Sequence, residues 1–330
     1  MTWVCISLLM LIIMVGGELA YRRYVTPRIC DIFENVPPFN IVAETANPDA
    51  EILQIPAADG TGLQGSLING QLAEPKGLVL FLPELRGNHW LAQRYCEALI
   101  QNGYVVMSVD FRSQGESAVK PGYVPIHWIT EYEMADVEAM LHFIESHPFL
   151  SSLPLLVYGV SRGGVAALVA ACRYPRVRGV VADSAFGTML MTRYFVDRFV
   201  SHVIPGWVYS LLPGWHVDLT LRQAMQLSEN RRHCRYVHLE FERESLDSSR
   251  VLLISGGRDS YVTPAIAERL RSIIGENCRL WIAPGAKHNM SRSICREEYD
   301  RRILHHFEVC LGGSSTAIEL HQEKSLVDAA

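Results

Sequence analysis

The chain has 330 residues, of which 49% are hydrophobic and 20% charged, so it can bury a large core and is not intrinsically disordered. Its formal net charge of −5 gives no reason to expect nucleic acid as a partner. The 8 cysteines are scattered, without a Cys-x-x-Cys pair or a zinc-finger spacing, which favours free thiols in a reducing compartment.

The N-terminal segment, residues 1–21, contains an uncharged apolar run from Trp3 to Gly17. The run is short for a membrane span, but extension to Tyr21 brings it into range. No basic residue precedes the run, as one would in a cleaved signal peptide, whereas arginines follow it closely. By the positive-inside rule this pattern predicts an uncleaved membrane anchor with the following domain in the cytoplasm. A cleaved signal peptide with secretion, and a buried or docked helix, are the alternatives.

Residues 22–49 contain several prolines and are predicted to form a tether. Two antiparallel strands, Glu51–Pro56 and Leu63–Asn69, are then predicted around a glycine-containing turn. Gly77–Leu82 is apolar throughout and predicts a buried strand, and the loop that begins at Pro83 runs from it into a helix.

A further buried strand, Tyr104–Val109, ends in the loop Asp110-Phe-Arg-Ser-Gln-Gly-Glu-Ser. We interpret this loop as structural, with a buried aspartate whose partners are local N–H groups and an arginine. Downstream, the segment Ile129–His147 has apolar residues at helical spacing with acids between them, and it predicts an amphipathic helix.

The stretch from Leu155 to Leu168 predicts a buried strand followed by a helix of small and apolar residues. Between them lies Gly159-Val-Ser161-Arg-Gly163, a Gly-x-Ser-x-Gly pentapeptide. Glycine two residues either side of the serine relieves the clash of a sharp strand-to-helix turn and leaves the serine strained and exposed above the sheet. The free N–H groups at the helix start favour a developing negative charge there. The motif therefore predicts Ser161 as a nucleophile.

Two later loops carry the other groups that a serine nucleophile needs, an acid and then a histidine. Arg250–Pro264 predicts a strand and a loop with Asp259, and Cys278–His288 predicts a strand whose loop ends at the histidine. Parallel sheets place functional groups past the carboxyl ends of their strands. We therefore predict that His288 is the general base and that Asp259 orients it, with Asp183 as the competing acid.

Residues 186–249 interrupt the alternation of strands and helices. The part from Leu190 to Trp215 is rich in Met, Phe, Tyr, Trp and Val, and it repeats Pro-Gly-Trp at 205–207 and 213–215. These aromatic residues either line or cover an acyl pocket or belong to an ordinary helical hairpin that turns at each Pro-Gly.

In its Gly-x-Ser-x-Gly elbow, followed by an acid and a histidine in that order, the chain closely resembles the α/β-hydrolase superfamily, most of all its esterase, thioesterase and serine-aminopeptidase-like branch. The resemblance covers residues 50–310, and 311–330 is predicted to be a flexible tail. It implies a mostly parallel eight-stranded sheet flanked by helices, with a helical cap (186–249) inserted after strand 6. It also implies chemistry without a cofactor, and the sequence has neither a His-Glu-x-x-His metal motif nor a dinucleotide glycine fingerprint.

The resemblance further implies an oxyanion hole made by the backbone N–H groups of Arg162 and of a residue in an earlier loop. That loop usually begins with His-Gly in the family, whereas here it begins with Pro83-Glu84, so the second donor would be Leu85. Glu84 is a departure, because a carboxylate near an oxyanion would oppose it. It must point away, with Arg86 as one candidate partner, or the hole differs from the family pattern.

The sequence therefore predicts a serine hydrolase that cleaves an ester or thioester of a small to medium acyl substrate through an acyl-enzyme, and that contacts a membrane through its N-terminal segment. A serine peptidase that cleaves an amide is the first alternative, because it would use the same triad on a different pocket. A catalytically inactive, membrane-tethered binding protein is the second, but it would lack a triad member and none is missing.

Overall fold

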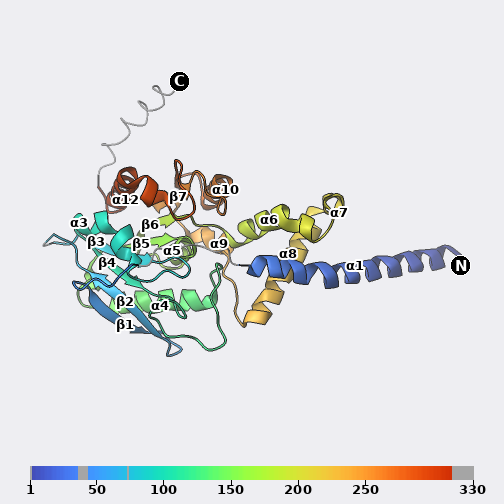
Figure 1. Ribbon diagram of the computed structural model, residues 1–330, viewed down its shortest axis with the longest axis horizontal. Coiled ribbons are helices and arrows are strands. Elements are labelled where there is room, and N and C mark those ends of the chain that lie inside the picture. The colour runs from blue at the N-terminus through green and yellow to red at the C-terminus, as the bar shows by residue number, and fades with distance from the viewer. Residues whose placement is uncertain (1, 36–43, 73, 314–330) are drawn as a thin grey trace, which may run out of the picture.

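An eight-stranded sheet with the strand order β1-β2-β4-β3-β5-β6-β7-β8 organises the computed structural model of the protein (Figure 1). The structure describes residues 2–35, 44–72 and 74–313, so part of the expected tether (36–43) and most of the expected tail (314–330) lie outside the described residues. The strands are β1 (Glu51–Pro56), β2 (Gly62–Ile68), β3 (Gly77–Leu82), β4 (Tyr104–Val109), β5 (Leu155–Val160), β6 (Val177–Asp183), β7 (Val251–Gly256) and β8 (Arg279–Ala283).

The strands from β4 to β8 run parallel, and only β1 and β2 add antiparallel pairs at one edge. β3, β4, β5 and β7 are buried along their whole length, as their continuous apolar runs predict for parallel strands covered on both faces. The structure confirms the expected mostly parallel eight-stranded sheet flanked by helices.

Two groups of helices cover the two faces of the sheet. Alternate residues of β3 belong to separate cores, one with α4, α5 and α10 and the other with α2, α3 and α12. These helices are α2 (Leu91–Tyr95), α3 (Glu97–Gln101), α4 (Glu131–Ser146), α5 (Arg162–Arg173), α10 (Pro264–Ile274) and α12 (Arg296–Cys310), and the short α11 (Ser291–Ile294) precedes the last of them.

Between β6 and β7 the chain leaves the sheet and forms a helical insertion, as the resemblance implies. It consists of α6 (Thr188–Phe199), α7 (Gly206–Leu211), α8 (Gly214–Arg232), the short α9 (Leu239–Glu242) and short 3-10 turns. Residues of α6 and α8 form a third core together with the N-terminal helix (Figure 1).

The N-terminal helix α1 (Thr2–Glu34) shows that the interpretation of residues 22–49 as a tether is wrong for the first half of that segment. The helix continues through Pro27 and packs against α8 and α6. Burial of a helical stripe outweighs the one backbone hydrogen bond that a proline removes. The buried residues of this stripe are Val25, Ile29, Cys30 and Phe33.

The first half of α1 is covered by no other described part of the chain and projects away from the sheet (Figure 1). Among the described residues, α1 is the one helix that is long and apolar enough to cross a membrane. Length and composition are also those of a signal sequence, so they suggest either role for this segment.

Candidate active site

β5 and α5 join at Ser161 in the sharp turn that the pentapeptide predicts. Ser161 has φ 52° and ψ −117°, a backbone conformation that costs a non-glycine residue free energy. A Cβ atom at Gly159 would lie 2.1 Å from the carbonyl oxygen of Gly163, and one at Gly163 would lie 2.1 Å from that of Leu82. The turn therefore requires both glycines, and it fixes the serine at the end of the central strand.

A chain of hydrogen bonds links Ser161, His288 and Asp259, which come from three separate loops. The Oγ of Ser161 lies 3.1 Å from Nε2 of His288. The Nδ1 of His288 lies 2.7 Å from Oδ2 of Asp259. With Nδ1 donating to the carboxylate, Nε2 is free of a proton and can accept one from the serine hydroxyl. The structure thus brings together the three residues that the sequence singles out.

Asp259 is held in place by its own loop. Its second carboxylate oxygen accepts the backbone N–H groups of Tyr261 at 2.8 Å and Val262 at 2.9 Å. The residue is 3% exposed, so these bonds are shielded from water. They aim the remaining oxygen at His288.

Asp183, the competing acid, is occupied elsewhere. The hydroxyl of Tyr299 donates to its Oδ2 at 2.8 Å, and that of Ser184 donates to its Oδ1 at 2.9 Å. Burial raises the pKa of Asp183 to about 6. The geometry therefore favours Asp259 as the partner of the histidine.

The two candidate oxyanion donors, Arg162 and Leu85, lie on segments that meet at Gly163. Arg162 is the first residue of α5, so its N–H has no acceptor within the helix. Leu85 follows β3, and the backbone just before it passes against Gly163. Within the described part of the chain, no group accepts either N–H. Both amides are therefore available to a negative charge on the substrate.

Glu84 is buried, whereas Arg86 is exposed. Its carboxyl accepts a hydrogen bond from the side-chain amide of Asn289, the residue after His288. Asn289 thus takes the place that the sequence suggests for Arg86. Burial, and after it the charge of Asp183, raises the pKa of Glu84 to about 8. At neutral pH the carboxyl is uncharged, so it does not oppose an oxyanion.

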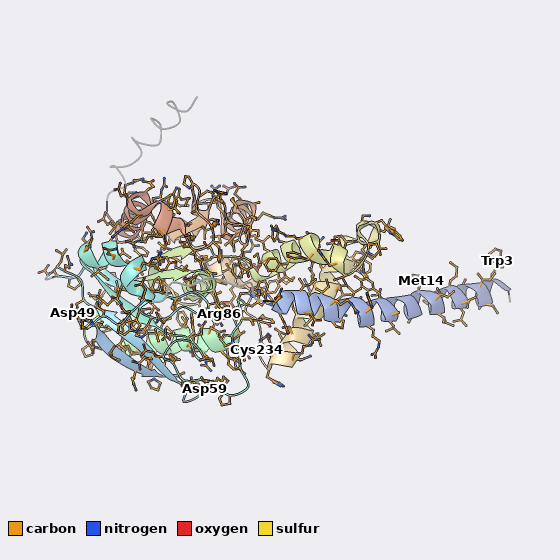
Figure 2. The ribbon with its side chains drawn as sticks, in the orientation of Figure 1. Trp3, Met14, Asp49, Asp59, Arg86 and Cys234 are labelled. Atoms are coloured by element: carbon orange, nitrogen blue, oxygen red, sulfur yellow. The ribbon has the colours of Figure 1, made fainter. Side chains whose placement is uncertain are left out.

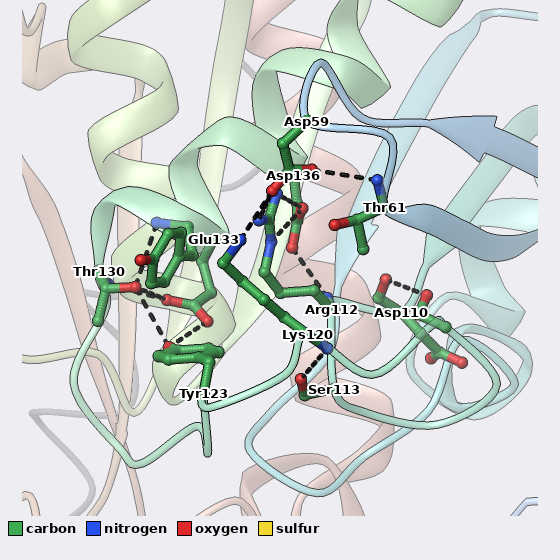
Figure 3. A network of polar contacts seen from close by, with 12 residues as sticks. Asp59, Thr61, Asp110, Arg112, Ser113, Lys120, Tyr123, Thr130, Glu133 and Asp136 are labelled. Atoms are coloured by element: carbon green, nitrogen blue, oxygen red, sulfur yellow. Dashed lines mark hydrogen bonds and ion pairs between the residues drawn. The ribbon is translucent and has the colours of Figure 1, made fainter. Parts of the chain in front are cut away.

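The side chain of Arg162 enters a buried network that the sequence analysis missed. It forms an ion pair with Glu133, and both side chains are 0% exposed. Glu133 also accepts the backbone N–H of Thr130 at 2.9 Å and the hydroxyl of Tyr123 at 2.6 Å (Figure 3). Loss of either partner would leave a buried charge without compensation. The capping box Thr130-x-x-Glu133 is the one part of this network with a sequence signal.

A second buried ion pair joins α4 to the Asp110 loop and corrects the interpretation of that loop (Figure 3). Asp110 accepts the backbone N–H groups of His89 at 2.5 Å and Glu116 at 2.8 Å, as expected. Arg112, however, pairs with Asp136 at 2.6 Å rather than with Asp110. Asp136 lies on α4, so the local sequence around Arg112 does not reveal this partner.

Aromatic rings line the His288 side of the site. The ring of Tyr261 lies 5.0 Å from that of His288, and the rings of Phe186 and Phe195 lie 6.3 Å and 5.4 Å from Tyr261. The ring of His127 lies 6.1 Å from Tyr261. Burial lowers the pKa of His127 to about 3, so the imidazole is neutral and the wall is uncharged.

Of the aromatic residues between Leu190 and Trp215, Phe195 belongs to this wall, but the two tryptophans of the Pro-Gly-Trp repeats do not. Trp207 is 70% exposed and Trp215 is 68% exposed. For the two Pro-Gly-Trp repeats, the exposure of both indoles favours the second alternative, a helical hairpin that turns at each Pro-Gly.

Neither a cluster of metal ligands nor a disulfide is found among the described residues. No group of three or more His, Cys, Asp and Glu among the described residues is placed to hold a metal ion. All 8 cysteines are described, and each is a free thiol.

Comparison with protein families places the chain in one of them. A family model described as "Serine aminopeptidase, S33" matches residues 73–238, half of the chain. The chain belongs to this family of α/β hydrolases. The matched region includes the elbow and most of the helical insertion of this S33 family member. A comparison with curated proteins gives no significant sequence match.

Solved structures share the fold of this S33 family member at low sequence identity. The esterase Pf2001 from Pyrococcus furiosus is 21% identical, with a TM-score of 0.60 over 84% of this chain and 97% of that one. XC6422 from Xanthomonas campestris, described as an α/β serine hydrolase without a lid, is 14% identical, with a TM-score of 0.53 over 82% and 99%. Est1E from Butyrivibrio proteoclasticus, with ferulic acid bound, is 17% identical, with a TM-score of 0.53 over 77% and 99%.

Replacement of Glu84 by glutamine should reduce the pH dependence of the free energy of unfolding. The fold raises the pKa of this carboxyl from 4.5 to about 8, so between these values the native state holds a proton that the unfolded state releases. The contribution of Glu84 is therefore full below its unfolded pKa and is lost as the pH rises toward 8. Urea unfolding at several pH values should show a flatter profile for Glu84→Gln than for the wild type.

Glu51→Gln, at an exposed residue of β1, is the matched control and should keep the wild-type profile. Parallel profiles for the wild type and Glu84→Gln would contradict a neutral, buried Glu84.

Proposed function

We propose that the protein is a serine hydrolase that cleaves the ester or thioester of a small to medium acyl substrate. The observation that carries this proposal is the chain of hydrogen bonds from Ser161 through His288 to Asp259 on a strained elbow. A strained serine with a base at hydrogen-bond distance and an acid behind that base is an arrangement suited to acyl transfer.

In the proposed reaction the Oγ of Ser161 attacks the acyl carbonyl carbon while Nε2 of His288 takes its proton. Asp259 holds the imidazole in the required tautomer and stabilises its charged form. The C–O or C–S bond of the tetrahedral intermediate then breaks, and the leaving alcohol or thiol takes the proton from His288. Water, deprotonated by the same histidine, attacks the acyl-enzyme, releases the acid and restores the serine.

The negative oxygen of the intermediate is proposed to bind the backbone N–H groups of Arg162 and Leu85. One such donor is worth about 3–4 kcal/mol of transition-state stabilisation in other serine hydrolases. Neutral Glu84 supports this assignment, since an ionised carboxylate in that loop would oppose the charge. The mechanism needs no cofactor, and a small-molecule acyl compound is the proposed partner.

Amide hydrolysis is the second candidate function, because the matching family is described as serine aminopeptidase. The same three residues would serve it, with an amine as leaving group. The structural neighbours described as an esterase and as bound to ferulic acid support the ester instead. A panel of p-nitrophenyl esters, acyl-CoA thioesters and aminoacyl amides distinguishes the classes by their kcat/KM values.

Ser161 should be labelled by a fluorophosphonate probe, and Ser161→Ala should lose both the labelling and ester hydrolysis. If the three residues act as a unit, turnover should fall by about 10⁶-fold. Ser201→Ala, at an exposed serine of the helical insertion, is the control and should keep both properties. Unchanged hydrolysis by Ser161→Ala would place the nucleophile elsewhere.

Asp259→Asn should lower turnover by about 10⁴-fold, because an amide at this position favours the wrong imidazole tautomer. Asp183→Asn should have a much smaller effect on turnover, because both carboxylate oxygens of Asp183 accept hydrogen bonds from hydroxyl groups of other residues. Steady-state kinetics of the two variants on the same ester gives the ranking. The opposite order would assign the acid to the end of β6.

We also propose that α1 anchors the protein in a membrane with the hydrolase domain on the cytoplasmic side. The uncovered apolar half of the helix supports an anchor, and the arginines that follow it support the orientation. The free cysteines agree with a reducing compartment. A secreted protein with a cleaved signal is the alternative.

Carbonate extraction should leave the full-length protein in the membrane fraction and should release a variant that lacks residues 3–17. This deletion removes the uncovered apolar run but keeps the part of α1 that packs on α8, so the fold is preserved. A reporter fused to the C-terminus should behave as cytoplasmic. A secreted mature protein that begins near Glu18 or Tyr21 would establish the signal peptide instead.

A further inference from the structure

The outer end of the helical insertion carries an uncharged and strongly apolar surface. We call residues 203–217 the cap tip; this segment comprises α7, the Pro-Gly turns on both sides of it and the start of α8. It contains no Asp, Glu, Lys or Arg. Three large apolar side chains of the cap tip face solvent, Trp207 at 70%, Leu211 at 73% and Trp215 at 68% exposure. Exposed apolar groups that gather in this way mark a contact surface.

The outward direction of these side chains is fixed by the packing of their neighbours. Val208, Tyr209 and Leu212 lie on the inner side of the cap tip and pack on the core shared by α1, α6 and α8. The two Pro-Gly pairs each begin a helix, with Pro205 and Pro213 at the N-cap positions. The cap tip is therefore an ordered part of the fold, and it holds three apolar side chains away from the rest of the protein.

Polar contacts place the cap tip at one particular level along α1. The Nε2 of His216 lies 2.9 Å from Oε2 of Glu18, and the ring of His216 lies 4.9 Å from that of Tyr21. Arg22 pairs with Glu18 and also donates to Gln223 of α8. Glu18 is the first charged residue after the apolar run. The cap tip thus lies where the apolar part of α1 ends.

The same level is where a bilayer surface would lie if α1 spans it. At 1.5 Å per residue, Tyr21 lies about 27 Å along the helix from Trp3, close to the ~30 Å thickness of a hydrocarbon core. Figure 2 shows Trp3 and Met14 on the uncovered part of the helix, far from the sheet. Tryptophan prefers the interface between hydrocarbon and water, where its ring is partly buried and its N–H stays hydrated.

We propose that the cap tip is a second membrane-contact surface, which inserts Trp207, Leu211 and Trp215 shallowly into the bilayer beside α1. The occupant of this surface is a phospholipid bilayer, because the uncovered apolar surface of α1 continues at the same level. The inference rests on the proposed anchoring by α1 and is independent of the proposed hydrolase reaction.

Tryptophan quenching by brominated lipid tests this surface in the full-length chain. The Trp3→Phe variant is reconstituted into phosphatidylcholine vesicles, with or without lipid brominated near the headgroup end of its acyl chains. The remaining tryptophans outside the cap tip are Trp90 and Trp128, which are buried, and Trp281, which is partly buried on β8. We expect strong quenching in Trp3→Phe, and loss of most of it when Trp207→Phe and Trp215→Phe are added.

Trp3→Phe with Trp281→Phe is the matched control and should keep the quenching of Trp3→Phe. Vesicle flotation of every variant reports anchoring separately, and hydrolysis of a soluble ester reports the catalytic reaction. Flotation without quenching at the cap tip would overturn the proposal while the anchor stands. A second copy of the chain would occupy the surface if Leu211→Ser dissociates a dimer in detergent and no quenching occurs. That result would also overturn the proposal and leave the anchor standing. Absence of flotation would overturn the anchor and this inference together.

Discussion

The close approach of two backbones at Gly163 is the constraint on which the site depends. The carbonyl oxygens of Leu82 and Pro83 occupy the space that a side chain at Gly163 would need. This contact brings the loop after β3, which carries Leu85, beside the first turn of α5, which begins at Arg162. It also keeps Ser161 at positive φ, a strain of about 1–3 kcal/mol that the buried pairing of β5 with β3 and β6 sustains.

The surroundings of the elbow keep fixed charge away from the proposed oxyanion. Arg162 could stabilise a nearby anion through its guanidinium, but that group is buried and paired with Glu133. Glu84 could oppose an anion, but burial keeps its carboxyl neutral at pH 7. Neither side chain therefore brings a charge to the proposed oxyanion, and backbone dipoles are the proposed source of its electrostatic stabilisation. Such dipoles are already oriented before the charge develops, which is what makes them effective.

Features that depend on local sequence could be predicted, and contacts between distant residues could not. The bounds of β1 match the predicted strand Glu51–Pro56, and α4 lies within the predicted segment Ile129–His147. The pairing of Glu84 with Asn289 spans 205 positions and follows no spacing rule, so only the fold reveals it. The positions of Ser161, Asp259 and His288 past the ends of strands were predictable, because each residue follows a recognisable strand in the sequence.

The prediction of a tether failed at residues 22–34, which are helical, and it failed for a different reason. Pro27 normally ends a helix, and sequence alone does not show that α8 offers a complementary apolar stripe. Local preference favoured a tether, whereas tertiary packing determines the outcome. The same residues that were interpreted as a flexible connection are thus part of the folded body.

This packing has a consequence for how the proposed anchor and the site are related. The ring of Phe33, near the end of α1, stacks on Trp128 at 4.5 Å, and the indole N–H of Trp128 donates to the carbonyl of Phe33 at 2.8 Å. Trp128 in turn contacts Phe186 at 5.7 Å, and Phe186 belongs to the aromatic wall beside His288. A flexible tether would let the site take any distance from a membrane. A continuous helix packed on the wall fixes that distance, so the position of the site relative to a bilayer follows from the geometry of α1.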